Sequence, residues 1–346
     1  MSRRVFRPTA SLLFPADPYF AHQRFDHVAL VHKAAETAGE TSEPMITWTR
    51  QWGPTAMRVT VATNRHYELP TEVFAAFLDP RLKYSSALYR HEGVPLDDAQ
   101  TAKLHFVADR LGVTTGDRVL DVGCGWGSLV LFLAQEYGCQ VTGVTLSRPQ
   151  AAYVERLAEQ SGVRGRVDVR LGPFIESEVA GQFDAVAMLG SIVHMPDRTR
   201  ALRKAHRLLR REGRLYLSET CFRNGAVHQE LAKLPGQRQV TDAMFGLADM
   251  VPLSTLVEGV ETAGFSVTGV TDLTSHYQRT TQDWESRVVA NRAAIDRIAP
   301  GLSEQLIRYL GTATAGWGHT TKHYAMTASK SRLGPEIPRQ VTIGGR

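Results

Sequence analysis

The residues best suited to bind a ligand form a glycine-rich stretch at 119–127, with the sequence VLDVGCGWG. Asp121 lies at the end of a short apolar run, and Gly123 and Gly125 follow it. Glycine has no Cβ, so the backbone here can approach a ligand closely. A carboxylate beside such a loop can organise the loop amides and favours a cationic sulfonium or amino group. The stretch therefore predicts a ligand with positive charge.

The spacing of the glycines separates this loop from common nucleotide-binding loops. Dinucleotide-binding folds use G-x-G-x-x-G and place an acidic residue about 20 positions further on, for a ribose. Here the spacing is G-x-G-x-G, and Gly143 is followed by VTLS, which contains no acidic residue. No Gly-Lys-Ser/Thr sequence follows the loop, which excludes a phosphate loop.

Strands alternate with helices along most of the chain, and these elements must position the loop. Short apolar runs predict strands over 118–122, 140–145, 167–171, 183–189, 215–220, 267–273 and 323–328. Apolar periodicity and helix-start residues predict helices over 21–38, 71–79, 97–111, 129–137, 149–160, 202–209, 253–260, 281–298 and 302–314. The alternation predicts an α/β fold with a doubly wound sheet, which binds ligands at the carboxyl ends of its strands.

Three segments fall outside this alternation. Residues 1–63 are expected to form a helical N-terminal arm and cap, which precedes the expected main domain at 64–330. Residues 222–252 have no strand partner and are expected to form a lid insertion over the sheet. Residues 331–346 are rich in Pro, Gly and Arg and predict a flexible tail.

The composition excludes several classes of protein. The 346 residues are 43% hydrophobic and 22% charged, which suits a globular protein. Three scattered cysteines cannot form a disulfide framework, and no apolar run reaches about 18 residues, so we expect a cytoplasmic protein. The net charge is +5, and Lys and Arg are spread along the chain. Because they form no basic stripe interleaved with aromatic residues, we expect no nucleic-acid binding. His319 and His323 have the spacing of metal ligands, but without nearby carboxylates or cysteines we expect no metal.

Several motifs together resemble the cyclopropane fatty acid synthase family of S-adenosylmethionine (SAM)-dependent methyltransferases, which includes the mycolic acid cyclopropane synthases. The resemblance covers residues 64–328, about three quarters of the chain. It rests on NRHYELP at 64–70, FLDP at 77–80, KYSSA at 83–87, LDVGCGWG at 120–127, GVTLSRPQ at 143–150, GF at 264–265, HY at 276–277, Trp284 and AN at 290–291. It implies a Rossmann-like class I methyltransferase sheet with a helical cap.

The resemblance also implies which residues bind SAM. Methyl transfer from SAM would leave S-adenosylhomocysteine as the product. Tyr84 and Ser85 would hold the amino-acid end of the cofactor. The other residues that the resemblance and the loop place at the cofactor are Asp121, Gly123, Gly125, Thr145, Leu146, Gln150 and Leu189. The absence of an acidic residue near Gly143 fits the family, which uses Thr-Leu-Ser and Gln there.

The chain departs from the family at the acceptor side. Cyclopropane synthases hold a bicarbonate ion, which removes a proton after the methyl group has added to an alkene. The family's Cys, Glu and His at this ion correspond here to Ser86, Val193 and Ser218, and its Tyr is retained as Tyr277. A buried anion without charged partners is unstable, so we expect no bicarbonate site and no cyclopropane product.

Three residues are candidates for the chemistry that remains. His194 follows the predicted fourth strand and could orient or deprotonate an acceptor, or bond to the next loop. Glu219 could act as a base, but on a strand it faces away from Ser218 and Thr220, which would make it an inter-element or surface carboxylate. Tyr277 could donate a hydrogen bond or present its ring to positive charge, or lie in the core.

The acceptor is expected to be a small or lipid-like molecule from natural product or lipid biosynthesis, and a homo-oligomer is left open. The first hypothesis is C-methylation of an unsaturated or electron-rich carbon of an apolar small molecule, isoprenoid or acyl chain. The alternatives are N-methylation of an amine, a lipid methyltransferase of the cyclopropane synthase type, and a cofactor-binding partner without activity. The intact cofactor motifs favour an enzyme.

Overall fold

The computed structural model describes residues 69–231 and 249–330, which belong to one compact unit spanning Trp52–Arg346. The predicted helix at 21–38, the boundary at 63, the tail at 331–346 and most of the predicted lid lie outside the described residues. The predicted domain division therefore stays a prediction.

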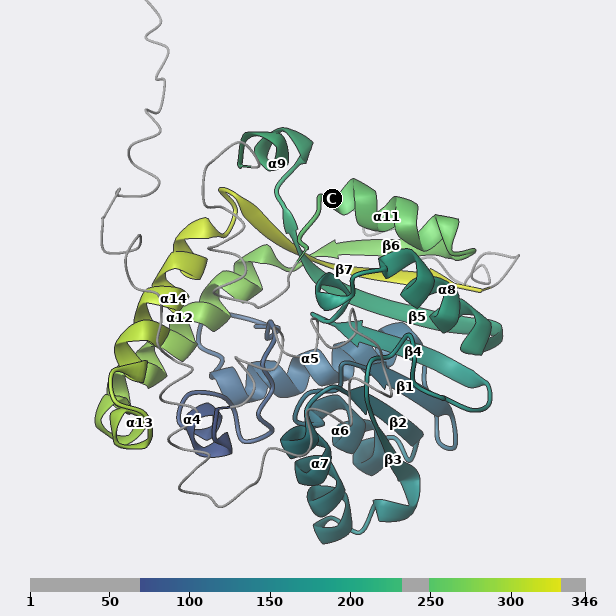
Figure 1. The fold of residues 1–346 in the computed structure, drawn as a ribbon, viewed down its shortest axis with the longest axis horizontal. Coiled ribbons are helices and arrows are strands. Elements are labelled where there is room, and N and C mark those ends of the chain that lie inside the picture. The colour runs from purple at the N-terminus through teal and green to yellow at the C-terminus, as the bar shows by residue number, and fades with distance from the viewer. Residues whose placement is uncertain (1–68, 232–248, 331–346) are drawn as a thin grey trace, which may run out of the picture. The chain divides into compact units, whose positions relative to one another are not determined.

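A seven-stranded sheet forms the centre of this unit (Figure 1). The strands are Arg118–Val122 (β1), Gln140–Thr145 (β2), Val167–Leu171 (β3), Phe183–Leu189 (β4), Leu209–Phe222 (β5), Ser266–Asp272 (β6) and Thr321–Ser329 (β7). Their order is β3-β2-β1-β4-β5-β7-β6, and β7 runs antiparallel to both of its neighbours. The predicted doubly wound α/β sheet is confirmed.

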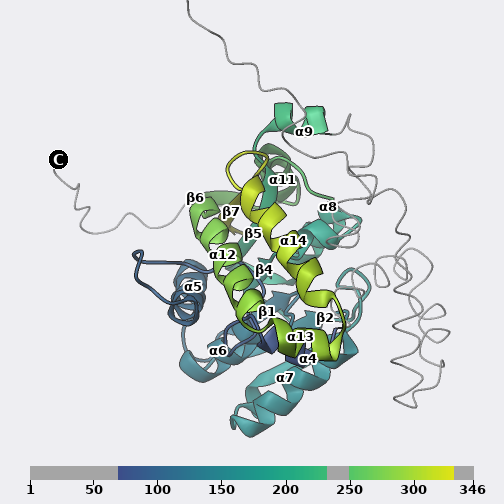
Figure 2. The same cartoon turned by 90° about the vertical axis from the view of Figure 1, so that its left-hand side faces the viewer.

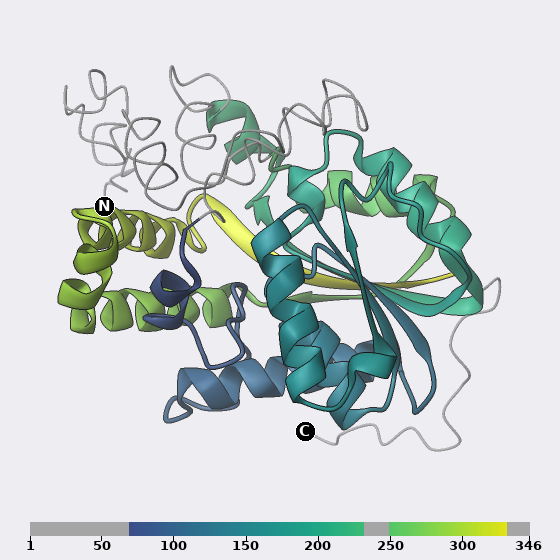
Figure 3. The same cartoon turned by 60° about the horizontal axis from the view of Figure 1, so that its bottom comes forward.

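Helices cover both faces of the sheet, and Figure 3 shows the two layers on either side of it. Leu96–Leu111 (α5), Ser128–Glu136 (α6) and Arg148–Gln160 (α7) share a buried apolar core with one face. Arg198–Leu208 (α8) and Leu253–Thr262 (α11) share a second core with the other face. The remaining short elements near the sheet are 3-10 turns at Arg164–Arg166 and Ile192–His194, and helix Gly225–Leu231 (α9). None of the described helices is long and apolar enough to cross a membrane.

A helical layer is inserted between β6 and β7. It consists of Thr274–Ala290 (α12), Arg292–Ile298 (α13) and Leu302–Gly316 (α14), and short helix Thr71–Ala75 (α4) lies beside it (Figure 2). Phe74 and Phe77 from the α4 region, Trp126 from the glycine loop and Trp284 from α12 belong to one buried cluster. This layer therefore connects the C-terminal part of the chain to the glycine loop, where the sequence predicts a ligand.

Two elements differ from their predicted bounds for tertiary reasons. The predicted helix at 281–298 starts earlier, at Thr274, and breaks at Asn291, whose backbone is not helical and whose Nδ2 donates to the Ala76 carbonyl. The predicted strand at 215–220 is longer at both ends, because Leu209 pairs with Phe183 of β4 and β5 pairs with β7 as far as Phe222. Neither the break nor the extension has a local sequence signal.

Candidate functional site

The glycine loop connects β1 to α6 in a conformation that suits glycine. Gly123 and Gly127 have φ of 83° and 78°, and a Cβ at either would collide with Ser191 or Val154 respectively. A Cβ on Gly125 would meet nothing within 4 Å. Two of the glycines therefore allow close packing, and Gly125 leaves backbone open to a ligand.

The loop lies where the strand order reverses, between β1 and β4. Leu189 is buried at the end of β4, and the following Gly190 donates its amide hydrogen to the Ser218 carbonyl at 2.8 Å. Ser191 donates its hydroxyl hydrogen to the Val122 carbonyl at 2.6 Å. These bonds hold the carboxyl ends of three strands together, at the edge where open α/β sheets bind ligands.

Asp121 lies beneath the loop and is almost fully buried, with 1% of its surface exposed. Its Oδ2 has no hydrogen-bond partner among the described residues. Burial raises the pKa of Asp121 to about 6, and this effect outweighs the attraction of nearby Lys83 and Lys103, which lower it. A buried carboxylate oxygen without a partner costs about 1–3 kcal/mol, so a ligand that donates a hydrogen bond there would relieve that cost.

Two buried lysines lie close to Asp121. Lys103 of α5 donates from Nζ to the Ser85 hydroxyl at 3.1 Å, and burial lowers its pKa. Lys83 is also buried with a lowered pKa, again because of desolvation. Gln100 donates from Nε2 to the Ser85 carbonyl at 2.9 Å and so fixes the segment that carries Lys83 and Ser85.

A second polar group follows β2. Thr145 donates its hydroxyl hydrogen to Gln150 Oε1 at 2.7 Å, and both side chains are buried. Ser147 caps α7 by accepting a hydrogen bond from the Gln150 amide. Leu146 lies between them and is half-buried. The bond from Thr145 uses the carbonyl oxygen of Gln150, and its NH₂ group is left as a donor for a ligand.

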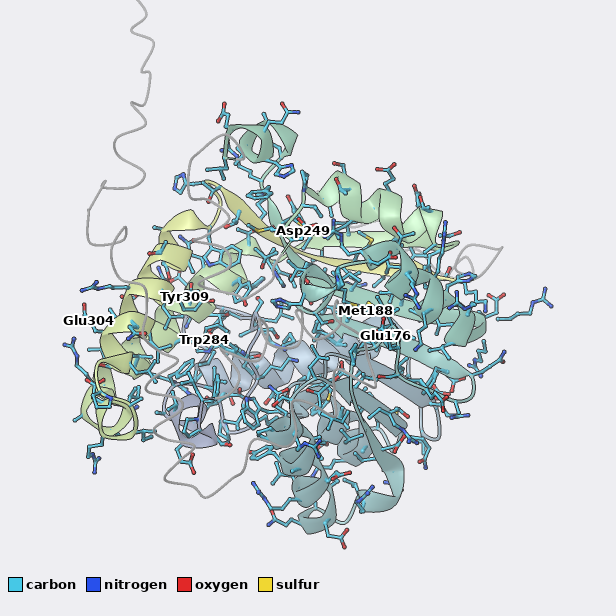
Figure 4. All side chains as sticks on the ribbon, viewed as in Figure 1. Glu176, Met188, Asp249, Trp284, Glu304 and Tyr309 are labelled. Atoms are coloured by element: carbon cyan, nitrogen blue, oxygen red, sulfur yellow. The ribbon has the colours of Figure 1, made fainter. Side chains whose placement is uncertain are left out.

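Tyr84 belongs to the aromatic cluster behind the loop. Its ring lies 5.0 Å from Trp284 and 5.9 Å from Phe74, measured between ring centroids. Figure 4 shows Trp284 among the side chains between α12 and the α4 region, where it is almost fully buried, as a core residue would be. The cluster fixes the segment 84–86 against the helical layer.

The donor set fits SAM, whose amino-acid end carries an ammonium and a carboxylate. Asp121 offers a buried negative group without a hydrogen-bond partner on Oδ2, and Lys83 and Lys103 offer positive groups beside it. The open backbone at Gly125 leaves room above the loop. Opposite charges in one buried site suit a zwitterion, because each charge of the ligand meets a group of opposite sign.

Glu219 is an inter-element carboxylate. It is 4% exposed, and it accepts hydrogen bonds from the Val193 amide at 3.3 Å and the Thr220 amide at 2.9 Å. Burial raises its pKa from 4.5 to about 7. Its side chain supports the 3-10 turn that carries His194, which is half-buried there.

Tyr277 is brought together with residues of the last strand. Its ring contacts Trp317 at 4.5 Å and His323 at 4.7 Å between centroids. The Thr220 hydroxyl and His323 Nδ1 form a hydrogen bond of 3.2 Å. Since Glu219 and Thr220 alternate along β5, Glu219 and Tyr277 lie on opposite faces of the sheet. The three predicted catalytic residues therefore do not form one cluster.

Sequence reasoning missed three buried groups: Lys83, Lys103 and His323. A signal for Lys103 existed, because Ala99, Lys103 and Val107 share the buried face of α5 at helical spacing. Lys83 lies near Asp121 and Cys124 of the glycine loop and His323 pairs with Thr220 of β5, and both sets of neighbours are distant in sequence. Within the described ranges no group of His, Cys, Asp and Glu could hold a metal.

Comparison with known proteins now decides the family. The model of the mycolic acid cyclopropane synthetase family matches residues 56–324. The chain belongs to this family. Its members are SAM-dependent methyltransferases. The match therefore confirms the predicted family, enzyme class and cofactor.

Individual relatives divide between two kinds of acceptor. The chain is 34% identical over 167 residues to a probable (S)-tetrahydroprotoberberine N-methyltransferase 2 of Papaver bracteatum, covering 48% of this chain and 46% of that one. It is 30% identical over 259 residues to cyclopropane mycolic acid synthase 1 of Mycobacterium tuberculosis, covering 71% and 88%. The chain thus spans about half the length of the plant relative.

The structure agrees with the sequence comparison. It matches mycolic acid cyclopropane synthase CmaA1, solved with S-adenosylhomocysteine (SAH) and CTAB, with a TM-score of 0.72 and 26% identity. The match covers 78% of this chain and 98% of that one. The similarity extends over the sheet and its covering helices, which confirms the class I methyltransferase fold.

Proposed function

We propose that this protein is a SAM-dependent C-methyltransferase for an unsaturated or electron-rich carbon of an apolar small molecule, isoprenoid or acyl chain. The observation that carries the proposal is the contrast between the two sides of the site. The cofactor side has buried charges, at Asp121, Lys83 and Lys103. The acceptor side has neutral aromatic and imidazole groups, at Tyr277, Trp317 and His323.

When bound, SAM supplies an electrophilic methyl group on a sulfonium. Asp121 would hold the ammonium of its amino-acid end, and Lys83 and Lys103 would stabilise its carboxylate. The side-chain NH₂ group of Gln150 would donate to the ribose or adenine region. These contacts fix the position of the methyl group, which supports catalysis because in-line displacement depends strongly on distance and orientation.

The acceptor side lacks the charges that a bicarbonate ion would need. Val193 replaces a carboxylate, Ser218 offers only a neutral hydroxyl, and the Ser86 hydroxyl already donates to the Ala87 carbonyl at 3.0 Å. A buried anion here would have no charged donor from these positions. This supports methyl addition followed by proton loss, without ring closure.

N-methylation of an amine is the second candidate, and the 34% identity to a plant N-methyltransferase favours it. An amine acceptor requires no base stronger than water if it enters uncharged. A protonated amine would first have to lose its proton to a nearby base such as a carboxylate. Tyr277, Trp317 and His323 supply no carboxylate, so the first candidate is the better supported.

The test is incubation of the full chain with methyl-labelled SAM and four acceptors. These are an isoprenyl diphosphate, an unsaturated phospholipid in mixed micelles, an indole and a cyclic secondary amine. We expect label on a carbon of one of the first three, located by NMR of the product. Label on nitrogen would support the second candidate. Cofactor binding without transfer to any acceptor would contradict both.

A further inference from the structure

His323 is a buried imidazole at the carboxyl end of β5. It lies on β7 opposite Thr220 in the antiparallel ladder, and only 2% of its surface is exposed. The sequence alone assigns it to a strand and gives it no role. Its side chain is on the same face of the sheet as Ser218 and Thr220, toward α5 and α12.

The contacts of His323 fix its ring and leave one nitrogen available. Nδ1 bonds with the Thr220 hydroxyl at 3.2 Å, and the backbone amide donates to Thr274 Oγ1 at 3.1 Å. Tyr277 packs edge-on against the ring. Among the residues that the structure describes, the hydrogen bond of the His323 ring is the one at Nδ1. The ring is therefore held from one side and can accept a proton on the other.

His323 is also close to the cofactor side. The positive charge of Lys103 is among the influences that lower the pKa of His323. Lys103 itself is bonded to Ser85, in the segment expected to hold the amino-acid end of the cofactor. The imidazole thus lies within electrostatic range of the cofactor residues while facing the aromatic groups of α12 and Trp317.

We propose that Nε2 of His323 takes the proton that the acceptor loses after C-methylation. This inference rests on the proposed function. The acceptor's π electrons form the new bond to the methyl carbon, and the carbon–sulfur bond breaks with its electrons staying on sulfur. The neighbouring acceptor carbon is left cationic. A C–H bond next to it then breaks, its electron pair forms the new double bond, and the proton binds the Nε2 lone pair.

The surroundings of His323 suit this step. Burial, and to a smaller degree Lys103, lower its pKa to about 3, while Asp272 raises it slightly, so the imidazole is neutral at physiological pH. A weak base of this kind cannot deprotonate a weak acid. A C–H bond beside a carbocation is a very strong acid, so a neutral imidazole is sufficient. Tyr277 and Trp317 present π systems beside it that favour transient positive charge.

The proposal requires one tautomer of His323. Nδ1 must carry the hydrogen and donate it to Thr220 Oγ1, so that Nε2 keeps its lone pair. Thr220 is then a positioning residue that sets the tautomer. The opposite tautomer, in which the Thr220 hydroxyl donates to Nδ1, would leave Nε2 protonated and unable to accept.

The first experiment compares His323→Asn with His319→Asn in the full chain. Asn keeps a group near the Nδ1 position but has no basic nitrogen. His319 is exposed and four residues away, which makes it a matched control. With the carbon acceptor methylated by the wild type, we expect His323→Asn to lower kcat about 100-fold or more while the Kd for SAH stays within about twofold. His319→Asn should match the wild type.

The second experiment reads the tautomer without turnover. Nitrogen-15 NMR of histidine-labelled protein saturated with SAH should show a neutral ring with its hydrogen on Nδ1, assigned by loss of the signal in His323→Asn. Thr220→Val should shift the population toward the Nε2–H tautomer, and Thr220→Ser should restore the wild-type pattern.

The outcomes separate this inference from the proposed function. If the wild type methylates no carbon acceptor, the proposed function fails and the inference fails with it. If the wild type methylates carbon but His323→Asn is equally fast, only the inference is overturned. A wild-type ring protonated on Nε2 overturns it as well.

Discussion

At the scale of single residues, the site depends on charged groups of both signs that the protein buries close together. Asp121 has a buried oxygen with no hydrogen bond from any described residue, and Lys83 and Lys103 are buried with lowered pKa values. Such an arrangement is costly in the free protein. The cost is offset when a ligand with both charges enters, which makes affinity sensitive to the protonation of each group.

Asp121 predicts a pH dependence of cofactor affinity. Its pKa is about 6 in the free protein, and under the proposed function the ligand ammonium would bind the ionised form. As pH falls below about 6 the carboxyl takes up a proton, so the affinity for SAH should fall by up to about tenfold per pH unit. Calorimetric titration between pH 5 and 8 measures this.

The matching variants are Asp121→Asn and Asp98→Asn. The first should weaken binding at pH 8 by about tenfold or more and flatten the pH profile, because no ionised carboxylate remains. Asp98 is exposed at the start of α5, and its variant should behave as the wild type. An unchanged affinity for Asp121→Asn would show that the ammonium binds elsewhere.

At the scale of elements, a buried hydroxyl of α12 connects the helical layer to the segment at 84–87 by hydrogen bonding, beside the packing of Tyr84 on Trp284. Thr280 of α12 is fully buried and accepts a hydrogen bond from the Ala87 amide at 3.0 Å, while donating to the His276 carbonyl at 2.6 Å. Ala87 directly follows Ser85 and Ser86. A movement of α12 therefore changes the position of the cofactor segment.

Thr280→Val should lower the free energy of unfolding by about 1–3 kcal/mol, because it leaves the buried Ala87 amide without an acceptor. It should also weaken SAH binding, since the segment 84–87 is less well held. Thr280→Ser retains the hydroxyl and should preserve both properties apart from a small packing loss. Denaturant titration and calorimetry measure the two effects, and a neutral Thr280→Val would refute the coupling.

Glu219 predicts that stability falls as pH rises through its range. Its pKa is 4.5 in the unfolded chain and about 7 in the folded protein, so between these values the folded state binds more protons. Stability from this group is therefore present below about pH 4.5 and is lost by about pH 7, with an upper bound of about 3 kcal/mol.

Glu219→Gln should remove this dependence, because the amide stays neutral. Relative to the wild type, the variant should gain stability between pH 5 and pH 8 in urea unfolding. Glu258→Gln, at an exposed position on α11, is the control and should keep the wild-type slope. Parallel pH profiles for wild type and Glu219→Gln would show that the carboxyl is not protonated in the folded state.

The elements that sequence predicts well are those with strong local patterns. The run ending at Asp121 and the glycines after it give β1, the loop and α6, and Ser147 marks the start of α7. The break at Asn291 depends on a contact with Ala76, and the full length of β5 depends on pairing with β4 and β7; no local pattern reports these contacts. Local chemistry specifies the cofactor loop, while tertiary packing determines the rest.

At the scale of the whole molecule, the proposed site has a cofactor half and an acceptor half, and the sequence predicts the residues of the first better than those of the second. The cofactor half is built from β1, β2 and β4 in chain order, and its residues follow family motifs. The acceptor half joins α12, β5 and β7, so His323 meets Thr220 across more than 100 residues. Sequence analysis could identify what the acceptor half had lost, at Val193 and Ser218, but not the imidazole that is present.

This division predicts that bicarbonate has no part in turnover. Removing dissolved carbon dioxide, or adding bicarbonate to millimolar concentration, should leave the rate within about twofold, because Ser86, Val193 and Ser218 offer the ion no charged partner. The product should show no cyclopropyl proton signals by NMR. A rate that rises with bicarbonate, or a cyclopropane product, would contradict this.

The place of β7 in the sheet has a consequence for synthesis on the ribosome. It is translated after the six other strands, yet it lies between β5 and β6. At about 5–20 residues per second, both of those strands wait for seconds with an open edge while α12 to α14 emerge. The residues of the proposed cofactor half are therefore synthesised seconds before β7 completes the proposed acceptor half. A chain arrested before β7 would bind cofactor without transferring a methyl group. The unpaired edges of β5 and β6 would make it prone to aggregation.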